Sequence, residues 1–429
     1  MTWSSFELRE IGKIITGKTP PSAQKEFYGG DIPFVTPSDM DGRRIIEKTA
    51  RYLTDSGAKK VASSFIEGSA ICVSCIGSDM GKAALVDGPF VSNQQINSVL
   101  VSDNFDRLFV YYNLSGRKDE IRNRASGAAQ PIMNKTDFGK LVVSAPTKGE
   151  QERISGILAL LDDKVELNRR TNGTLEAMVR VVFKDWFVDF SPTRRKAAGE
   201  TDPNAILGGL LLDSTKASAV AALFPDRFAD NGLPHGWEEH PLDQIADFLN
   251  GIALQKHPAK PGEDSMPVIK IAELRNGVTS NSNRASRDVP KKYVLKDGDY
   301  IFSWSGSLMA KYWTEGEGAL NQHLFKVTSE THPMWVVSSW VEHHLAEFQR
   351  IAAAKAVTMG HIKRSHLSEA MCVLPRQGDI GLMGEVIQPI MDLMIQNELE
   401  NQTLAATRDL LLPKLMSGEI RLKDAEDAA

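Results

Sequence analysis

Long apolar runs and a leader-like N-terminus are both missing from this sequence of 429 residues. It has no run of about 18 apolar residues, which is roughly what a helix needs to cross a bilayer. The opening residues, MTWSSFELRE, lack the basic and apolar segments of a secretion signal. With 42% hydrophobic and 24% charged residues, the chain can form two or three globular domains with cores of their own. We therefore expect a globular, cytoplasmic protein.

Cysteine and metal-binding patterns are also scarce. The three cysteines, Cys72, Cys75 and Cys372, are too few for a disulfide framework. Cys72 and Cys75 lie in an apolar, strand-like run, and no second cysteine pair accompanies them. The nine histidines include no His-Glu-x-x-His motif, and neighbouring His343 and His344 would point about 100° apart on a helix. We expect no metal ion and no cofactor.

Strong charge of one sign is missing as well. The formal net charge is -5, and no segment forms a polybasic arm. Any contact with nucleic acid must therefore come from local patches. Two stretches are candidates, residues 348–368 and residues 117–140, because each is locally basic. The alternative for both is an ordinary solvated face.

Catalytic motifs are incomplete. Residues 12–19 match the phosphate-loop pattern G-x-x-x-x-G-K-T, but such a loop needs a buried strand before it and a helix after it. Here residues 6–10 are half polar, and Pro20 and Pro21 remove two backbone amides. These are also the only consecutive prolines, so the Asn/Asp-Pro-Pro-aromatic motif of a DNA methyltransferase is missing. The sequence predicts no active site.

The strongest positive signal is a helical segment that occurs twice, 229 residues apart. Apolar residues recur at alternating spacings of four and three, which is typical of a coiled-coil seam. Eight of the ten seam positions are apolar in the first copy and seven in the second, although only 42% of the chain is hydrophobic. The seam positions are Ile154, Leu158, Leu161, Val165, Asn168, Asn172, Leu175, Val179, Val182 and Trp186, then Met383, Ile387, Ile390, Met394, Asn397, Asn401, Leu404, Arg408, Leu411 and Leu415.

The repeat predicts how the two helices pair. If they cross antiparallel about a pseudo-twofold axis, the numbers of partner residues sum to 569, so Asn168 faces Asn401 and Asn172 faces Asn397. Buried asparagines in this position would fix the register. The alternative is that they face water where the helices splay. The residues expected to pair the helices are Leu158, Val165, Asn168, Asn172, Leu175, Val179, Met394, Asn397, Asn401 and Leu404.

The globular segments repeat too. Trp3 and Leu8 match Trp237 and Leu242, and the dipeptide at residues 93–94 matches that at residues 321–322. We expect an α+β fold with two diverged, mixed domains joined by two long helices that pair as an antiparallel coiled coil. The expected division is 1–147 for the first domain, 148–190 for the first helix, 191–235 for a linker, 236–376 for the second domain, 377–418 for the second helix and 419–429 for a tail.

Four motifs resemble the DNA-specificity (S) subunit of type I restriction-modification systems. They are TRDLLLPKLMSGEI at residues 407–420, FKDWFVDF at 183–190, EQERI at 150–154 and LPHGW at 233–237. The resemblance covers essentially the whole chain, including its half-repeat layout. The chain departs from the family pattern at residues 252–254, at Met359 and at Pro389 inside the second helix.

The resemblance implies a non-catalytic subunit that binds double-stranded DNA. In this family each globular segment is a target recognition domain that reads half of a bipartite site, and the helices act as a spacer. The subunit docks two methyltransferase (M) subunits and restriction/translocase (R) subunits. A scaffold that pairs proteins through its helices without touching DNA is the alternative function.

Sequence readout needs polar and basic side chains at the groove edge. The matching pairs Asn93-Gln94 and Asn321-Gln322 have an alternative role as turn or core hydrogen-bonders, because residues shared by both copies favour a common scaffold. The candidate DNA-binding residues are Lys18, Thr19, Ser78, Lys82, Asn93, Gln94, Gln130 and Lys135 in the first domain, and Ser307, Lys311, Asn321, Gln322, Lys363 and Arg364 in the second.

Overall fold

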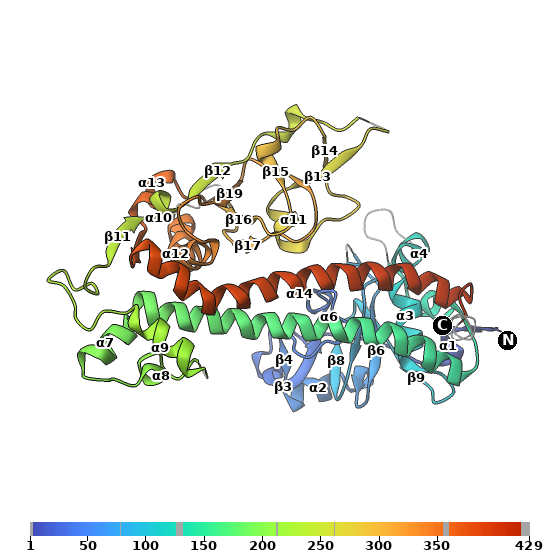
Figure 1. Ribbon diagram of the computed structural model, residues 1–429. Coiled ribbons are helices and arrows are strands. Elements are labelled where there is room, and N and C mark those ends of the chain that lie inside the picture. Colours follow the sequence, from blue (N-terminus) through green and yellow to red (C-terminus); the bar gives the residue numbers. More distant parts are fainter. Residues whose placement is uncertain are drawn as a thin grey trace. The chain divides into compact units, whose positions relative to one another are not determined.

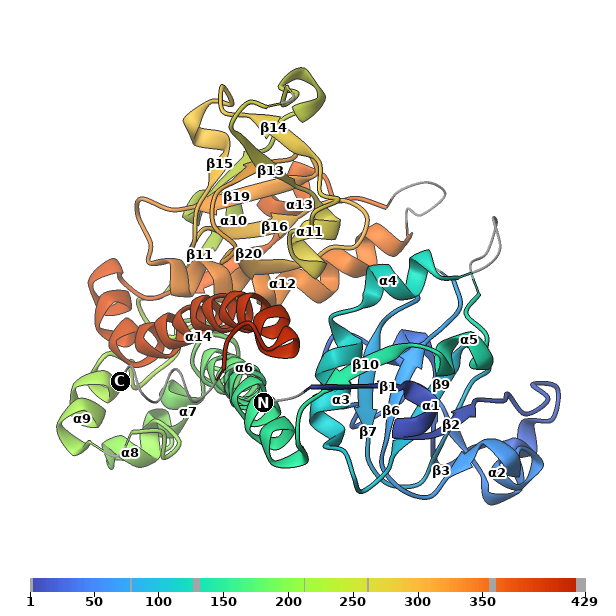
Figure 2. The same ribbon diagram turned by 90° about the vertical axis from the view of Figure 1, so that its right-hand side faces the viewer.

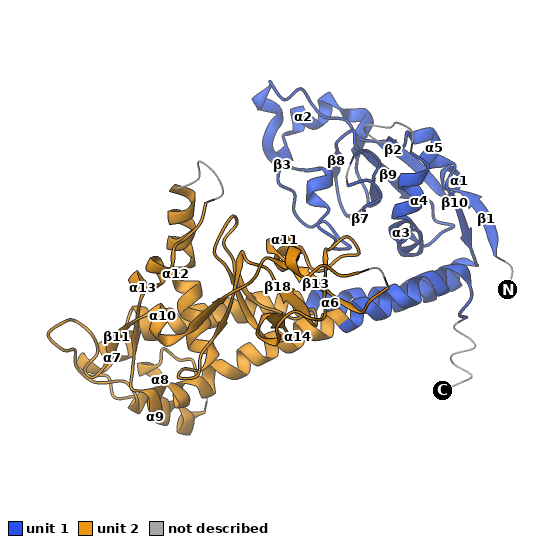
Figure 3. Cartoon of the chain, turned by 90° about the horizontal axis from the view of Figure 1, so that it is seen from above, with its two compact units in different colours: residues 1–167, 403–429 blue, residues 168–402 orange. Residues whose placement is uncertain are grey.

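The chain folds into two compact units, and the boundary between them falls inside both long helices (Figures 1 and 3). Unit 1 consists of residues 1–167 and 403–429, and unit 2 of residues 168–402. Each unit therefore holds one globular domain and a piece of each helix. The computed structural model describes residues 3–77, 79–125, 132–211, 213–260, 262–354 and 360–421.

The domain of unit 1 is built on three small sheets. Strand β1 pairs antiparallel with β10, and the two four-stranded sheets have the orders β2-β9-β6-β7 and β4-β3-β8-β5. Helix α3 packs on the β6 and β7 side of the first of these sheets (Figure 2). The strands are β1 Ser4–Glu7, β2 Gly12–Thr16, β3 Tyr28–Val35, β4 Tyr52–Leu53, β5 Phe65–Ile66, β6 Ala70–Ser74, β7 Ala83–Val86, β8 Phe90–Ser92, β9 Ile96–Val101 and β10 Val142–Ala145. The helices are α1 Leu8–Ile11, α2 Asp55–Lys60, α3 Arg107–Ser115, α4 Lys118–Asn123 and α5 Lys135–Gly139, with short 3₁₀ turns at Lys25–Phe27, Pro37–Asp39 and Ala62–Ser64.

The domain of unit 2 repeats this topology strand for strand. Its sheets have the orders β11-β20, β12-β19-β16-β17 and β14-β13-β18-β15, and the parallel pairing of β3 with β8 recurs as that of β13 with β18. The predicted duplication of an α+β domain is confirmed. The strands are β11 Glu238–Pro241, β12 Asp247–Asn250, β13 Ser265–Ile269, β14 Arg284–Ser286, β15 Val294–Leu295, β16 Tyr300–Ser303, β17 Ala310–Tyr312, β18 Gly318–Leu320, β19 Leu324–Thr328 and β20 Met371–Leu374. The helices are α10 Leu242–Ile245, α11 Ile271–Asn276, α12 Met334–Ala354 and α13 Arg364–Glu369, with 3₁₀ turns at Leu254–Lys256 and Lys291–Tyr293.

One glycine recurs because the backbone leaves no room for a side chain. A Cβ at Gly17 would lie 2.1 Å from the carbonyl oxygen of Asn93, and one at Gly251 would lie 2.3 Å from that of Asn321. Both distances are far shorter than van der Waals contact. Only glycine therefore fits directly after β2 and, in the second domain, directly after β12, where the backbone passes the turn at Asn93 or Asn321. The match between the two copies at this position therefore reflects shared packing.

The long helices are α6 (Lys148–Phe183) and α14 (Gln377–Ser417), and they run antiparallel (Figure 1). Every one of the twenty predicted seam positions is buried or half-buried, whereas Leu160 and Leu167, off the seam, are exposed. The antiparallel coiled coil predicted from the spacing is confirmed. Beyond Phe183 the helix widens into a π-helical turn at Lys184–Val188 and then ends at Phe190, whose φ is 53°.

Four asparagines form a polar layer inside the helix pair. The Nδ2 atom of Asn168 donates to Oδ1 of Asn401 at 3.0 Å, and Nδ2 of Asn397 donates to Oδ1 of Asn172 at 2.8 Å. Asn172 also donates to the backbone carbonyl of Met394 at 3.0 Å. The four side chains are 2–8% exposed, so they are turned away from water. Any shift of register would leave these buried amides without partners, which makes the layer a register-fixing device.

The segment expected to be a linker is folded. It contains α7 (Ser191–Ala197), α8 (Pro203–Ile206) and α9 (Ser214–Ala222), and residues of α8 and α9 join the main core of unit 2. Its basic residues are used internally, because Arg195 pairs with Asp185 at 3.0 Å. Lys196 donates to the carbonyl of Ala221 at 3.2 Å. The sequence gives little signal for these short helices, because few of their residues, such as Ile206, Ala217 and Val220, are apolar and buried.

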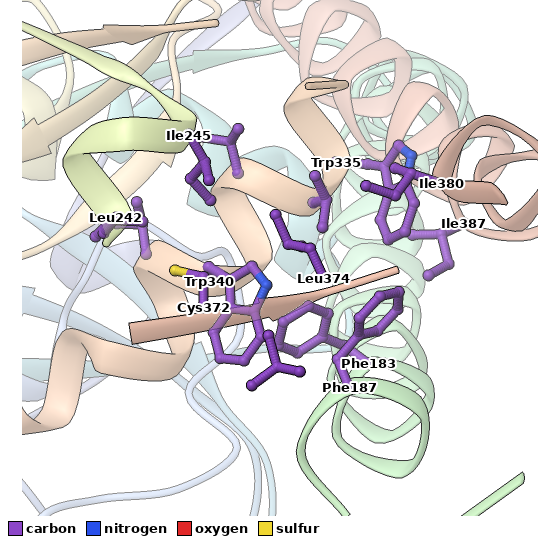
Figure 4. Close-up of a cluster of buried hydrophobic side chains, with 14 of the residues drawn as sticks. Phe183, Phe187, Leu242, Ile245, Trp335, Trp340, Cys372, Leu374, Ile380 and Ile387 are labelled. Carbon is purple, nitrogen blue, oxygen red and sulfur yellow. The ribbon is translucent and has the colours of Figure 1, made fainter. Parts of the chain in front are cut away.

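The core that receives these helices is strongly aromatic (Figure 4). Phe187 of the π-helical turn packs against Trp335 with ring centroids 5.8 Å apart, and Phe183 meets Trp340 edge-on at 5.0 Å. Ile380 and other apolar residues of α14 close the cluster from the second helix. Aromatic pairs of this kind add roughly 0.5–1.5 kcal/mol each beyond area burial. The second domain is thus fused to both helices by apolar contacts.

The polar layer generates a stability prediction. Replacing Asn397 by alanine removes its hydrogen bond to Asn172 and leaves a buried carbonyl unpaired, which should lower the free energy of unfolding by about 1–3 kcal/mol. Urea unfolding followed by circular dichroism measures the change. Gln402→Ala, on the exposed side of the same helix, is the matched control and should change stability by less than about 0.5 kcal/mol. Equal effects of the two variants would contradict a structural role for the layer.

Candidate nucleic-acid interface

In unit 2 several loops meet at one end of the sheet β12-β19-β16-β17. The strands end there together, because Asn250 of β12 is the partner of Phe325 in β19, and Ser303 of β16 is the partner of Leu324. The loop after β16 is joined to residue 360 by a hydrogen bond from the amide of Gly306 to its carbonyl at 2.8 Å. This end therefore gathers residues 250–252, 304–308, 321–323 and 360–364.

Trp304 lies at the centre of this end. Its indole N–H donates to Oδ1 of Asn250 at 2.9 Å, which fixes the plane of the ring. The ring centroid lies 5.9 Å from that of His323 and 6.3 Å from that of His361. His323 is itself held, since its Nδ1 lies 3.0 Å from the hydroxyl of Ser305. The result is a half-buried group of polar and aromatic side chains with fixed orientations.

The structure brings most candidate residues of the second domain to this end. Asn321 is 5% exposed and accepts the amide of His323 at 3.3 Å, so it shapes the turn. Arg364 places its guanidinium 5.8 Å from the ring of Phe325 and donates to the carbonyl of Phe248 at 3.1 Å. The remaining candidates at this end are Ser307 and Lys363, which are exposed, and Gln322, which is half-buried. Lys311 lies apart, in the middle of β17.

The candidates Lys18 and Thr19 of the first domain lie at the equivalent end of the sheet β2-β9-β6-β7. The ammonium of Lys18 bonds the hydroxyl of Ser63 at 2.9 Å, and the hydroxyl of Thr19 bonds the side chain of Gln94. Asn93 is 7% exposed and accepts the amide of Gln95 at 3.1 Å.

The other candidates of the first domain lie around this end or outside the described residues. Lys82 is paired with Asp79 at 2.8 Å. Lys135 is exposed at the start of α5. Ser78 and Gln130 lie outside the described residues.

Trp304, His323 and His361 are not among the residues that the sequence predicts to bind DNA. That prediction favours residues that match between the two copies, such as Asn93 and Asn321, and both of these are buried and bond within their turns. Positions that differ between the copies, next to turns that match, are better candidates for distinguishing two ligands. They can be recognised only when the strand register shows which residues of the two domains are equivalent.

The phosphate-loop match has no structural counterpart. Residues 12–16 form strand β2 of a sheet, and a 3₁₀ turn at residues 25–27, after an intervening loop, is the next helical element along the chain. Burial raises the pKa of the Cys72 thiol to about 12 and that of Cys75 to about 11, so both stay protonated at neutral pH. Among the described residues there is no cluster of metal-ligating side chains, and no helix is long and apolar enough to span a bilayer.

The two locally basic stretches differ where the structure describes them. In 117–140, Arg117 and Arg124 both pair with Glu120, at 2.6 Å and 2.9 Å, and Lys140 pairs with Asp137 at 3.5 Å. In 348–368, Arg350 pairs with Glu347 at 2.5 Å, whereas Lys363 and Arg364 are exposed near the loop ends. The positive charge at this end of the sheet therefore comes from single residues of the second stretch.

In unit 1 a buried polar network attaches the domain to both helices. The carboxylate of Asp162 on α6 accepts the hydroxyl of Tyr112 and the guanidinium of Arg408 on α14, each at 2.7 Å. Arg44 donates to the same hydroxyl at 3.2 Å and pairs with Asp163. Burial, reinforced by the neighbouring Asp162 carboxylate, raises the pKa of Tyr112 well above its usual value. The arginine that interrupts the apolar seam is thus the counterion of a buried carboxylate.

Comparisons with known proteins agree with this architecture. The family model described as "Type I restriction modification DNA specificity domain" matches residues 1–177. The chain is 24% identical over 440 aligned residues to the MjaIX specificity subunit of Methanocaldococcus jannaschii, covering 98% of this chain and 94% of that protein. It is also 24% identical to the HindI specificity subunit of Haemophilus influenzae, covering 68% of this chain and 71% of that protein.

A solved structure shares the fold. The S subunit of a type I restriction-modification system from M. genitalium aligns with a TM-score of 0.53 at 15% identity, covering 97% of this chain and 96% of that chain. At this identity the likeness concerns the fold alone.

The network in unit 1 predicts unequal effects for two adjacent carboxylates. Asp162 is 11% exposed, and its removal leaves the partly buried Arg408 without its main counterion, so Asp162→Ala should cost about 3 kcal/mol of unfolding free energy. Asp163 is 60% exposed, and its partner Arg44 also donates to Tyr112 and to the carbonyl of Ala159, so Asp163→Ala should cost less, about 1 kcal/mol. Chemical unfolding of both variants compares them. A loss for Asp163→Ala as large as that for Asp162→Ala would show that burial does not set the strength of this attachment.

Proposed function

Since the chain belongs to the specificity subunits of type I restriction-modification enzymes, we propose that it reads a bipartite DNA site, with one half recognised by each globular domain. The observation that carries the proposal is the exact repetition of the sheet topology in both units, each ending in its own cluster of loops. Identical scaffolds with different loop side chains suit two related but distinct ligands. Two half-sites of one DNA target are such ligands.

The chemistry of the loop ends supports direct readout of bases. Major-groove recognition uses amide, imidazole, hydroxyl and cationic groups for hydrogen bonds, and apolar faces for the thymine methyl group. Gln94 is exposed in unit 1, and Trp304 and His323 are partly exposed in unit 2. Lys18, Lys363 and similar cations at these ends would contact phosphates and so position the domain.

The subunit is the non-catalytic part of the enzyme, and it acts as a member of a type I restriction-modification complex. We propose two M subunits and the R subunits as its partners in the cytoplasm, with methylation and cleavage carried out by them. Helix α6 supports this, because it exposes large apolar side chains in both units. Leu160 and Leu167 are 69% and 58% exposed in unit 1, and Met178 and Val181 are 46% and 63% exposed in unit 2. Exposed apolar stripes of this kind suit protein partners.

A domain exchange tests the division of labour. Residues 1–146 are replaced by the equivalent segment of another specificity subunit, while Arg44 and Tyr112 are retained so that the attachment to Asp162 survives. We expect one half of the methylated sequence to change and the other half to stay. Methylation mapping of the complex reconstituted with M subunits gives the result. A change in both halves would contradict independent reading, and retained partner assembly without any DNA binding would favour a protein scaffold.

The helix pair predicts how the gap between half-sites is set. Seven residues inserted after Asp163 and seven after Ala405 lie opposite each other, since positions 163 and 406 sum to 569, so the asparagine layer and the Asp162–Arg408 pair keep their partners. The insertion lengthens both helices by about 10 Å, and the unspecified gap should grow by roughly three base pairs.

The matched control carries the seven residues after Asp163 alone, which should shift the register and abolish activity. Methylation mapping with the partner subunits reads out both variants. Activity at the original gap in the double insertion would show that the helices do not set the spacing.

A further inference from the structure

Equivalent positions of the two domains can be assigned from backbone hydrogen bonds. The amide of Cys75 donates to the carbonyl of Gln95 at 2.7 Å, and the amide of Trp304 donates to that of His323 at 3.4 Å. These two bonds join equivalent pairs of residues. In the first domain the amide of Met133 also donates to the carbonyl of Cys75 at 2.9 Å.

The third connection completes the assignment. The amide of Ile362 donates to the carbonyl of Trp304 at 3.0 Å, as Met133 does to Cys75. The isolated bridge between Ile76 and Ile132 recurs between Ser305 and His361. Trp304, His323 and His361 therefore occupy the places of Cys75, Gln95 and Ile132.

These positions separate into a constant and a variable set. The constant set includes Gly17 with Gly251 and Asn93 with Asn321, which are fixed by close packing and by burial. Residues confined in this way maintain the turn and cannot distinguish two DNA sequences. The variable set is built on the same backbone and carries different chemistry in each domain, as a specificity determinant must.

The variable residues in unit 2 are positioned by neighbours and reach the surface. Asn250 fixes the indole of Trp304, Ser305 contacts Nδ1 of His323, and Gln322 lies 3.4 Å from Nε2 of the same ring. Trp304 and His323 are half-buried and His361 is exposed. Side chains that are held in this way meet the requirement for precise base readout, because little conformational freedom is lost on binding.

Cations surround this group. Lys363 and Arg364 follow His361 closely in the chain and are exposed. A pocket of about 340 Å³ lies beside the loop 304–308 and is lined by Arg275, Ser307 and Gln349 among others. Exposed Arg275 has no hydrogen-bond or ion-pair partner within the described part of the chain. Basic side chains flanking a polar and aromatic centre match a DNA groove with its bordering phosphates.

We propose that Trp304, His323 and His361 are the specificity-determining residues of the second domain, contacting base edges of the second half-site in the major groove. This inference rests on the proposed function, since it names the residues that perform the reading. The imidazole groups contact base-edge donors or acceptors, and the indole offers an apolar face to a thymine methyl group. In the first domain these three positions hold Cys75, Gln95 and Ile132, so the two domains read different bases.

The test places side chains of the first domain at the equivalent positions of the second domain. His323→Gln and His361→Ile, separately and together, give the second domain the residues of the first while leaving the turn glycine and asparagine untouched. The full complex with M subunits is assayed on the mapped target and on duplexes with each base of the second half-site replaced. We expect discrimination at one or more second-half positions to fall by about tenfold or more. Recognition of the first half-site and binding to random duplex should stay unchanged.

The matched control is His257→Gln, because His257 belongs to the same unit but contacts Asp288, and its carbonyl accepts the amide of Ser286 in β14 of the other four-stranded sheet. Unchanged discrimination in the His361→Ile variant and in the double variant would overturn the assignment while leaving half-site reading intact. An equal loss in the His257 control would also overturn it. Absence of any sequence preference in the wild-type complex would instead reject the proposed function. His361 is exposed, so the His361→Ile variant should fold normally, and it tests the assignment even if the double variant folds poorly.

Discussion

The antiparallel pairing of α6 and α14, fixed by four buried asparagines, is the constraint on which the rest of the molecule depends. Apolar seams alone would tolerate sliding by a heptad, whereas hydrogen bonds from Asn168 to Asn401 and from Asn397 to Asn172 exist in one register only. Both globular domains are attached to these helices by side chains of the helices themselves. The register therefore decides which helix residues each domain meets.

The two domains are attached to the helices by different interactions, although their folds are the same. In unit 1, the nearly buried Asp162 and the partly buried Arg408 form an ion pair that also holds Tyr112 of the domain. In unit 2, stacked and edge-on aromatic contacts centred on Phe183 and Phe187 replace it. A charged attachment requires exact partners, because a single missing group leaves a buried charge. An aromatic one tolerates repacking more readily.

The helices and the duplication could be predicted from the sequence because a hydrophobic period and an internal repeat are visible in the order of the residues, without knowledge of any contact. Asn168 and Asn401 were paired correctly by symmetry alone, and the structure places them 3.0 Å apart. The partner of Arg408 could not be found in this way, since Asp162 lies 246 residues away and the repeat gives no symmetric counterpart for the pair. The folded helices within 191–235 were missed because few residues there carry the apolar signal. The loop group around Trp304 was missed because it depends on strand register.

We propose that the two domains of this chain each carry a DNA-reading surface of common design. The most direct test is the methylation pattern of genomic DNA in cells that express this chain together with the methyltransferase subunit proposed as its partner. We predict one motif with two short defined halves separated by a run of unspecified bases of constant length. A single continuous motif, or two halves separated by variable distances, would contradict the account.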